Sequence, residues 1–180
     1  IKNYKNMVTM DLKQTDNILL VVGKTEGDLN QSLFARDVLN EKNGPPPEIN
    51  LFNEKNNGLI VLRLINEMLI QSCHDISLGG ILVAVAKMCI KSSKGIKINP
   101  LKSLINKFEY FFGEDQARYL IEVNSKNLKK VKNILKDNSI SFEDFGTVTK
   151  DKLQFDKEID LTLEDLNNAY KNWLRKYMVS

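Results

Sequence analysis

The sequence has few of the residues that build metal centres and disulfide frameworks: its 180 residues include one histidine and two cysteines. Cys73 and Cys89 form no Cys-x-x-Cys pair, and neither has a histidine or a second cysteine at the spacing of a metal site. This scarcity excludes a zinc-ribbon type of site and a disulfide-stapled secreted fold. We therefore expect two buried free thiols, a reducing cytoplasmic location and no metal site within this chain.

Long apolar runs and a one-sided charge are also missing. No stretch reaches the roughly 18 apolar residues of a membrane span, and the N-terminus is polar rather than signal-like. The 26 basic and 23 acidic side chains leave a net charge of +3, and the lysines are spread along the chain. We therefore expect neither a membrane nor a nucleic acid as a partner. The chain begins with Ile1, as expected for a piece of a longer polypeptide.

The most informative stretch runs from Ser72 to Ile90 and joins a polar half to an apolar half. The polar half contains His74, next to Asp75, and ends at the pair Gly79-Gly80. The apolar half has no proline and predicts a helix that is buried on nearly every side. The N–H groups of a helix's first turn are unpaired and attract anions, and glycine permits a close approach of the ligand. The alternative is an ordinary turn with a helix cap, and a histidine–aspartate pair that is only structural.

A second polar loop precedes another predicted helix. Residues 17–23 form a short apolar run that predicts a strand buried on both faces, and residues 33–41 follow as a helix. The intervening Asn30, Gln31 and Ser32 would lie at the N-terminus of this helix. Serine and asparagine cap helices in many proteins, so a cap and a ligand contact are both open for Ser32.

The rest of the chain alternates helical and extended patterns. Apolar residues recur with helical spacing in 57–71 and 127–137, and with strand spacing in 119–123, 142–148 and 153–155. Thr162 and Asp165, three residues apart, indicate a capping box for a terminal helix. The apolar face of that helix would consist of Leu166, Tyr170, Trp173, Leu174 and Tyr177. No repeat or long linker divides the chain, so we expect one domain over residues 1–180, of α/β or α+β class around one sheet.

Several motifs occur in an order and spacing that resembles one enzyme family. They are Leu29-Asn30-Gln31-Ser32, Gly44-Pro45-Pro46-Pro47, the run from His74 to Gly80, Phe112-Gly113-Glu114-Asp115-Gln116-Ala117-Arg118, and the ending Trp173 to Met178. Together they resemble the last domain of the large subunit of phosphoribosylformylglycinamidine (FGAM) synthase. The same kind of domain occurs in aminoimidazole ribonucleotide (AIR) synthetase, selenophosphate synthetase and the hydrogenase maturation dehydratase. The resemblance covers nearly the whole chain.

The resemblance implies an α+β domain of three layers, α/β/α, in which helices flank a mixed sheet. It also implies one domain of a purine-biosynthesis ligase, which uses ATP to activate the amide oxygen of formylglycinamide ribonucleotide and ammonia from glutamine to displace the phosphate. In that family the N-terminal domains carry the catalytic histidine and most of the machinery for ATP and Mg²⁺. The resemblance therefore implies no catalytic residue in this chain. It implies partners in the N-terminal domains of the same enzyme, a glutaminase subunit and a small accessory subunit.

Two family motifs carry over to residues of this chain. The first reads Leu-Gly-Gly/Gln-Ser and helps to hold the substrate's phosphate; Gln31 and Ser32 match it, and Asn30 replaces a glycine. Asparagine tolerates a left-handed backbone better than most residues, so we expect the loop to survive this change. The second reads His-Asp-Val-Ser-Asp-Gly-Gly, and Leu78 replaces its second acid. If that acid contacts a ligand or a metal in the family, this chain has lost the contact, whereas if it only caps the helix, little changes. The substrate- and phosphate-binding residues implied are Asn30, Gln31, Ser32, His74, Asp75, Ser77, Gly79 and Gly80, with Ser32 as the first choice for the phosphate contact.

Two other functions remain open on the sequence. One is a sister enzyme that shares this domain, such as AIR synthetase, selenophosphate synthetase or a kinase, although the prolines at 45–47 and the loop at 113–116 resemble the synthase more. The other is a stand-alone domain that binds a ribonucleotide or serves as a docking surface. A one-domain native product would favour that second function.

Overall fold

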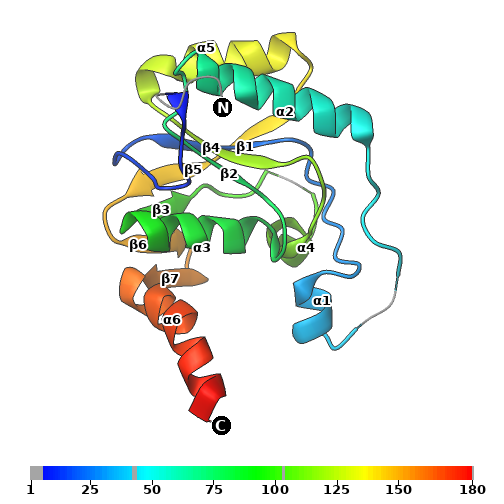
Figure 1. Ribbon diagram of the computed structural model, residues 1–180, viewed down its shortest axis with the longest axis vertical. Helices are drawn as coiled ribbons and strands as arrows, with labels where there is room; N and C mark the ends of the chain where they lie inside the picture. Colours follow the sequence, from blue (N-terminus) through cyan, green and yellow to red (C-terminus); the bar gives the residue numbers. More distant parts are fainter. Residues whose placement is uncertain (1–5, 42–43, 103, 180) are drawn as a thin grey trace.

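The computed structural model describes residues 6–41, 44–102 and 104–179, without the side chains of residues 173–176 and 179. Its strands are β1 (Ile18–Val22), β2 (Ser72–Asp75), β3 (Gly95–Ile98), β4 (Tyr119–Val123), β5 (Phe142–Thr149), β6 (Lys152–Phe155) and β7 (Ile159–Thr162). They form a seven-stranded sheet in the order β2-β4-β1-β5-β3-β6-β7 (Figure 1). β3 and β6 run parallel and the other neighbours antiparallel, so the sheet is mixed.

Helices cover both faces of this sheet. The helices of the described residues are α1 (Leu33–Asp37), α2 (Leu51–Asn66), α3 (Gly80–Ser92), α4 (Lys107–Phe112), α5 (Ser125–Asp137) and α6 (Leu163–Val179). α2 and α5 lie over one face, α3 and α4 lie over the other, and α6 extends away from the sheet toward the C-terminus (Figure 1). This arrangement of helices, sheet and helices confirms the predicted three-layer α/β/α fold around a mixed sheet.

β1 is an interior strand of the sheet, and its side chains are apolar on both faces. Leu19 and Val21 pack in the core on the α3 side, whereas Leu20 and Val22 pack in the core on the side of α2 and α5. None of these four side chains has exposed surface. Successive side chains of a strand point to opposite faces, so an uninterrupted apolar run fits a strand covered on both sides. The strand predicted for this stretch is confirmed.

α3 is the helix predicted for the apolar half of the central stretch. Ile81, Val85, Met88 and Cys89 are completely buried in it, which explains why the run contains almost no polar residue. Both cysteines are free, with Cys89 buried and Cys73 partly buried. Burial raises the pKa of each thiol to about 12, so both remain protonated and unreactive at neutral pH.

Several elements differ from the sequence prediction. α2 begins at Leu51, earlier than predicted, because the side chain of Asn50 accepts hydrogen bonds from the amides of Phe52 and Asn53 at 3.1 and 3.0 Å. It also ends earlier, and Met68 just beyond it has a positive φ of 54°. α1 is shorter than predicted. The sequence patterns did not predict β2, β7 or α4.

The capping box at the start of α6 is confirmed. The hydroxyl of Thr162 accepts a hydrogen bond from the amide of Asp165 at 3.1 Å, and the amide of Thr162 donates to Asp165 Oδ2 at 3.0 Å. The two residues thus satisfy each other's unpaired backbone donors. Among the helices of the described ranges, none is long and apolar enough to cross a membrane.

The apolar face predicted for α6 is only partly visible. Leu166 packs in the core with α3, whereas Tyr170 and Tyr177 are exposed. The side chains of Trp173 and Leu174 lie outside the described residues. The start of α6 is therefore anchored to the domain through Leu166.

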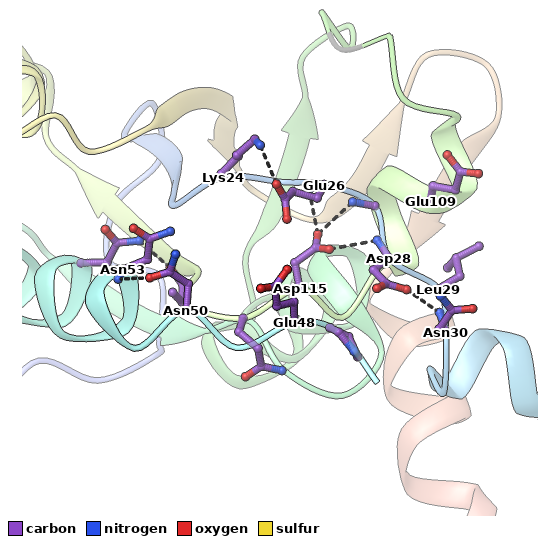
Figure 2. A pocket seen from close by; sticks show the side chains of 15 residues that line it. Lys24, Glu26, Asp28, Leu29, Asn30, Glu48, Asn50, Asn53, Glu109 and Asp115 are labelled. Atoms are coloured by element: carbon purple, nitrogen blue, oxygen red, sulfur yellow. Dashed lines mark hydrogen bonds and ion pairs between the residues drawn. The ribbon is translucent and has the colours of Figure 1, made fainter. Parts of the chain in front are cut away.

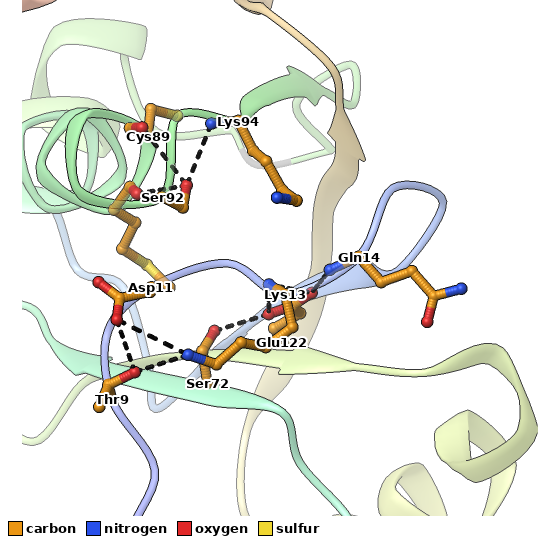
Figure 3. A network of polar contacts seen from close by, with 10 residues as sticks. Thr9, Asp11, Lys13, Gln14, Ser72, Cys89, Ser92, Lys94 and Glu122 are labelled. Atoms are coloured by element: carbon orange, nitrogen blue, oxygen red, sulfur yellow. Dashed lines mark hydrogen bonds and ion pairs between the residues drawn. The ribbon is translucent and has the colours of Figure 1, made fainter.

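The segment before β1 is held against the sheet by Glu122 of β4, which has no exposed surface. Its carboxylate accepts hydrogen bonds from the backbone amides of Lys13, at 2.9 and 3.0 Å, and of Gln14, at 3.1 Å (Figure 3). It also accepts from the Asn17 side chain at 2.7 Å and from the Ser72 hydroxyl at 2.9 Å. One buried carboxylate therefore ties the N-terminal segment to β2 and β4.

Candidate functional site

A cleft of about 630 Å³ lies where the loop after β1, the segment before α2 and the loop before β4 meet (Figure 2). Its lining residues come from 24–30, 47–57 and 109–117. Loops carried by a rigid sheet are the usual place for binding groups, and a concave site of this size is a natural candidate for a ligand. Of the eight substrate- and phosphate-binding residues that the resemblance implies, only Asn30 lines this cleft.

Asp115 fixes the loop after β1. Its Oδ2 accepts hydrogen bonds from the amides of Glu26 and Gly27 at 3.1 and 3.0 Å, and its Oδ1 accepts from the amide of Asp28 at 2.9 Å (Figure 2). Successive backbone N–H groups around one anion form the kind of nest that binds phosphate in other proteins. Here a carboxylate of the chain itself fills the nest, so these three amides do not face a ligand.

Arg118 is the cationic partner of Asp115, with 3.4 Å between Nη1 and Oδ2. The guanidinium is buried, and it donates to the backbone oxygen of Asp115 at 3.1 Å and to that of Gly113 at 2.7 Å. Burial lowers the pKa of Arg118, and the negative charge of Asp115 opposes that shift. Arg118 therefore stabilises the loop at 113–115 through buried contacts and does not line the cleft.

Glu114 joins the two loops that the sequence singled out. One oxygen, Oε1, accepts hydrogen bonds from the amide of Leu33 and from the amide of Gly79, both at 2.8 Å. Leu33 is the first residue of α1, and Gly79 is the N-cap of α3. The carboxylate thus lies at two helix N-termini at once, where the partial positive charge of the helix favours an anion. The two motifs are brought together by a side chain to which the sequence analysis gave no role.

Ser32 is the N-cap of α1. Its buried hydroxyl accepts a hydrogen bond from the amide of Ala35 at 3.1 Å. The left-handed residue of this loop is Gln31, with φ of 58°, rather than Asn30, and the Gln31 side chain donates to the backbone oxygen of Gly44 at 2.9 Å. The cap is therefore present in the structure, while a phosphate contact by these three residues stays a prediction.

His74 and Asp75 lie at the end of the edge strand β2. His74 Nδ1 and Asp75 Oδ1 are 3.2 Å apart. Burial lowers the pKa of His74, and the negative charge of Asp75 opposes this shift. His74 Nε2 is buried and has no hydrogen-bond partner among the residues that the structure describes. The structural pair is therefore present, and a direct ligand contact of His74 stays a prediction.

The glycine pair allows α3 to begin close to the end of α4. Gly79 and Gly80 have positive φ angles of 88° and 71°, and a Cβ on Gly80 would lie 2.6 Å from the backbone oxygen of Phe111. Ser77 is exposed, and its backbone oxygen accepts from the amide of Gly80 at 3.0 Å. Leu78 is exposed and precedes the N-cap, so the acid that it replaces in the family would not be the N-cap of α3 in this geometry.

The charge of the cleft is negative. Its lining contains one cation, Lys24, and five carboxylates, those of Glu26, Asp28, Glu48, Glu109 and Asp115. The ammonium of Lys24 pairs with Glu26 at 2.5 Å. Within the described part of the chain, no group of three or more His, Cys, Asp or Glu residues is placed to hold a metal ion. The cleft of this domain alone therefore disfavours a phosphate.

Sequence reasoning missed the organising role of Glu114, Asp115 and Arg118. These residues were part of a motif that carried the family resemblance, but they were assigned no contact. A signal was present, because two adjacent acids and an arginine stand between an aromatic helix end and an apolar strand. Charged residues next to such strands are seldom buried without partners.

Comparison with known proteins identifies the family of this domain. Residues 14–156 match the model of the family described as AIR synthase related protein, C-terminal domain. The chain is 58% identical over 178 residues to the phosphoribosylformylglycinamidine synthase subunit PurL of Pelagibacter ubique, and 38% identical over 178 residues to the subunit of the same name of Bartonella bacilliformis. Both alignments cover 99% of this chain and 24% of the relative, so the chain spans about a quarter of the length of these curated relatives.

A solved structure has the same fold. PurL of T. maritima complexed with FGAR matches with a TM-score of 0.75, over 91% of this chain and 30% of that chain, at 16% sequence identity. At this identity the likeness supports the fold alone, whereas the family model covers most of the chain. The chain therefore belongs to the family of AIR synthase related proteins, and it is their C-terminal domain.

Proposed function

We propose that this chain is the C-terminal domain of an FGAM synthase, which converts formylglycinamide ribonucleotide (FGAR) and glutamine to FGAM with ATP in de novo purine biosynthesis. The observation that carries the proposal is the 58% identity over 99% of the chain with PurL of P. ubique. Residues 1–180 are then one domain of a longer polypeptide. A sister enzyme is less favoured, because both curated relatives compared above are named as this synthase subunit.

In this enzyme the domain forms one wall of the active-site cleft and supplies no reacting group. Asp115 holds the loop after β1, and Glu114 holds the starts of α1 and α3. A fixed backbone suits a substrate-positioning wall, because small displacements of binding groups reduce the rate strongly. The phosphate-binding part is formed or shaped by Asn30, Gln31, Ser32, His74, Asp75, Ser77, Gly79 and Gly80. Ser77 replaces Ser32 as our first choice for direct contact, because the Ser32 hydroxyl is buried as a helix cap, whereas the Ser77 side chain is exposed beside the N-terminus of α3.

ATP and Mg²⁺ bind mainly to the rest of the enzyme in this proposal. The lining residues do not fit a triphosphate, since five carboxylates face one paired lysine, and the described residues offer no cluster of metal ligands. The N-terminal domains would bring the positive charge to the cleft. A glutaminase subunit and a small accessory subunit complete the proposed assembly. We expect it in the cytoplasm, where free thiols stay reduced.

The first test is an assay of the full-length polypeptide that contains this chain, with ammonia as the nitrogen donor in place of glutamine. We expect formation of ADP and FGAM that depends on FGAR. If the rate of ATP hydrolysis does not depend on FGAR but depends on another ribonucleotide, the proposal is overturned in favour of a sister enzyme. The absence of any FGAR-dependent reaction in a folded preparation would overturn it as well.

In the same enzyme, Ser77→Ala tests the site. Loss of a hydrogen bond to a charged phosphate costs about 1.5–3 kcal/mol, so we expect the KM for FGAR to rise tenfold or more while the KM for ATP stays the same. Ser125→Ala is the matched control, because Ser125 is exposed and begins α5 at the other end of β4 from the cleft. Equal KM values for FGAR in both variants would remove Ser77 from the phosphate site.

A further inference from the structure

A second cavity, of about 290 Å³, lies between α5, the start of β5 and the segment that follows β3. It shares no lining residue with the acidic cleft. Three lysines, Lys102, Lys132 and Lys136, contribute to its wall together with the apolar Pro100, Leu101 and Phe142. None of these six residues belongs to the motifs that the sequence analysis connected with phosphate.

Both carboxylates of this cavity already have partners. Asp144 pairs with Lys132 at 2.6 Å. Glu143 accepts a hydrogen bond from the hydroxyl of Tyr110 at 2.5 Å. Burial raises the pKa of Tyr110, and the hydrogen bond to Glu143 raises it further, so the phenol remains a donor. The buried Arg118 also interacts electrostatically with Glu143, which offsets part of its charge.

The other two lysines of the cavity have no carboxylate partner in the described ranges. Lys102 and Lys136 are exposed, and neither has an ion pair with any residue in the ranges that the structure describes. The five charged residues of the wall leave one net positive charge. The cavity is therefore lined by two lysines without an ion pair in those ranges and by three apolar residues, and its net charge is opposite in sign to that of the cleft. Lysine is a common phosphate ligand, as a flexible point charge.

We propose that this cavity binds a small organic phosphate, a monoester whose dianion lies between Lys102 and Lys136 and whose apolar body lies against Pro100, Leu101 and Phe142. The volume is slightly below the range of pockets for drug-sized ligands, so the ester group is small. The site goes beyond the proposed synthase function, because it lies outside the cleft that the synthase reaction would use.

A small hollow of about 170 Å³ shares lining residues with both regions. It shares Lys24 with the cleft, and it shares Tyr110, Phe142 and Glu143 with the lysine-lined cavity. The loop after β1 and the lysine-lined cavity therefore contribute residues to the wall of the same hollow.

The test is calorimetric titration of the full-length polypeptide with phenyl phosphate, inorganic phosphate and phenol. We expect saturable binding of phenyl phosphate, weaker binding of inorganic phosphate and none of phenol. Lys136→Gln should weaken the binding of phenyl phosphate about tenfold, as expected for one lost charged hydrogen bond, and the double variant with Lys102→Gln should weaken it further. Both lysines are exposed, so the variants should keep the fold.

Lys129→Gln is the matched control, because it removes the same charge from the same helix at an exposed residue outside the cavity. Unchanged affinity in the double variant would overturn the proposal. Equal weakening by Lys129→Gln would also overturn it, since the attraction would then be diffuse. If inorganic phosphate binds as tightly as phenyl phosphate, the ligand is the free ion and the proposed monoester is wrong.

Discussion

Glu122 and Asp115 are both buried carboxylates, and each binds the backbone of a segment that lies far away in the sequence. Glu122 accepts hydrogen bonds from two amides and two side chains, yet it has no ion pair with a residue of the described ranges. Asp115 accepts from three successive amides and also pairs with Arg118 at 3.4 Å. The Glu122 carboxylate is thus bound by neutral donors alone, whereas the Asp115 carboxylate also has a cationic partner.

The surroundings of the two carboxylates account for the difference. Glu122 lies within the sheet, where donors from β2 and from the N-terminal segment replace the lost water. Asp115 lies at the wall of the cleft next to a buried guanidinium, which itself requires an anion. Glu122 therefore maintains the architecture of the sheet, whereas Asp115 maintains the shape of the site.

Of the variants at Glu122, Asp115 and Ser32, Glu122→Ala should lower the free energy of unfolding most. The variant leaves several buried donors without an acceptor, each at a cost of about 1–3 kcal/mol, and we expect a total loss of about 4 kcal/mol in the free energy of unfolding. Urea unfolding of the chain measures it. Glu158→Ala is the control, because Glu158 forms only an exposed ion pair with Lys107 and should cost less than about 1 kcal/mol. Equal stability of the two variants would contradict a structural role of Glu122.

Asp115→Ala should have the next largest effect, about 3 kcal/mol, because it leaves Arg118 without its carboxylate. Backbone oxygens still accept from the guanidinium, so we expect the loss to stay below that of Glu122→Ala. Amide hydrogen exchange should accelerate at Glu26, Gly27 and Asp28, whose amides lose their acceptor. Asp115→Asn keeps one acceptor oxygen and should show a smaller change. Unchanged exchange at these three amides would disprove the role of Asp115 in fixing the loop.

Elements with a strong local pattern were predictable from the sequence. The strand at 119–123 was predicted with its observed bounds because its alternation is regular, and the capping box at Thr162 was predicted because its two partners are three residues apart. β2 was missed because Ser72-Cys73-His74-Asp75 has no apolar alternation. It is a strand because β4 pairs with it on one side, and the backbone oxygen of Thr9 accepts from the amide of Cys73. Such pairing depends on tertiary contacts that a local pattern does not contain.

The candidate site was predictable only in its parts. The sequence indicated that Ser32 and Gly79 stand at helix starts, and both do. It could not indicate that one oxygen of Glu114 binds the amides at both starts, because the three segments are far apart in the chain. It indicated that Asn30 would tolerate a left-handed backbone, whereas the structure has that conformation at Gln31. The net charge of +3 did not reveal the acidic cleft, since a chain total does not show where charges gather.

Ser32→Ala should have the smallest effect of the three, because the Ser32 hydroxyl accepts a hydrogen bond from a backbone amide and carries no charge. Loss of a helix N-cap costs about 1 kcal/mol, less than either carboxylate, and urea unfolding against the parent chain measures this. The full-length enzyme separates the cap from a ligand contact. If Ser32 only caps α1, Ser32→Thr restores the stability and the KM for FGAR stays within about twofold in both variants. If Ser32 also binds the phosphate, Ser32→Ala raises that KM about tenfold or more, out of proportion to the lost stability. A stability equal to that of the parent chain would contradict the cap itself.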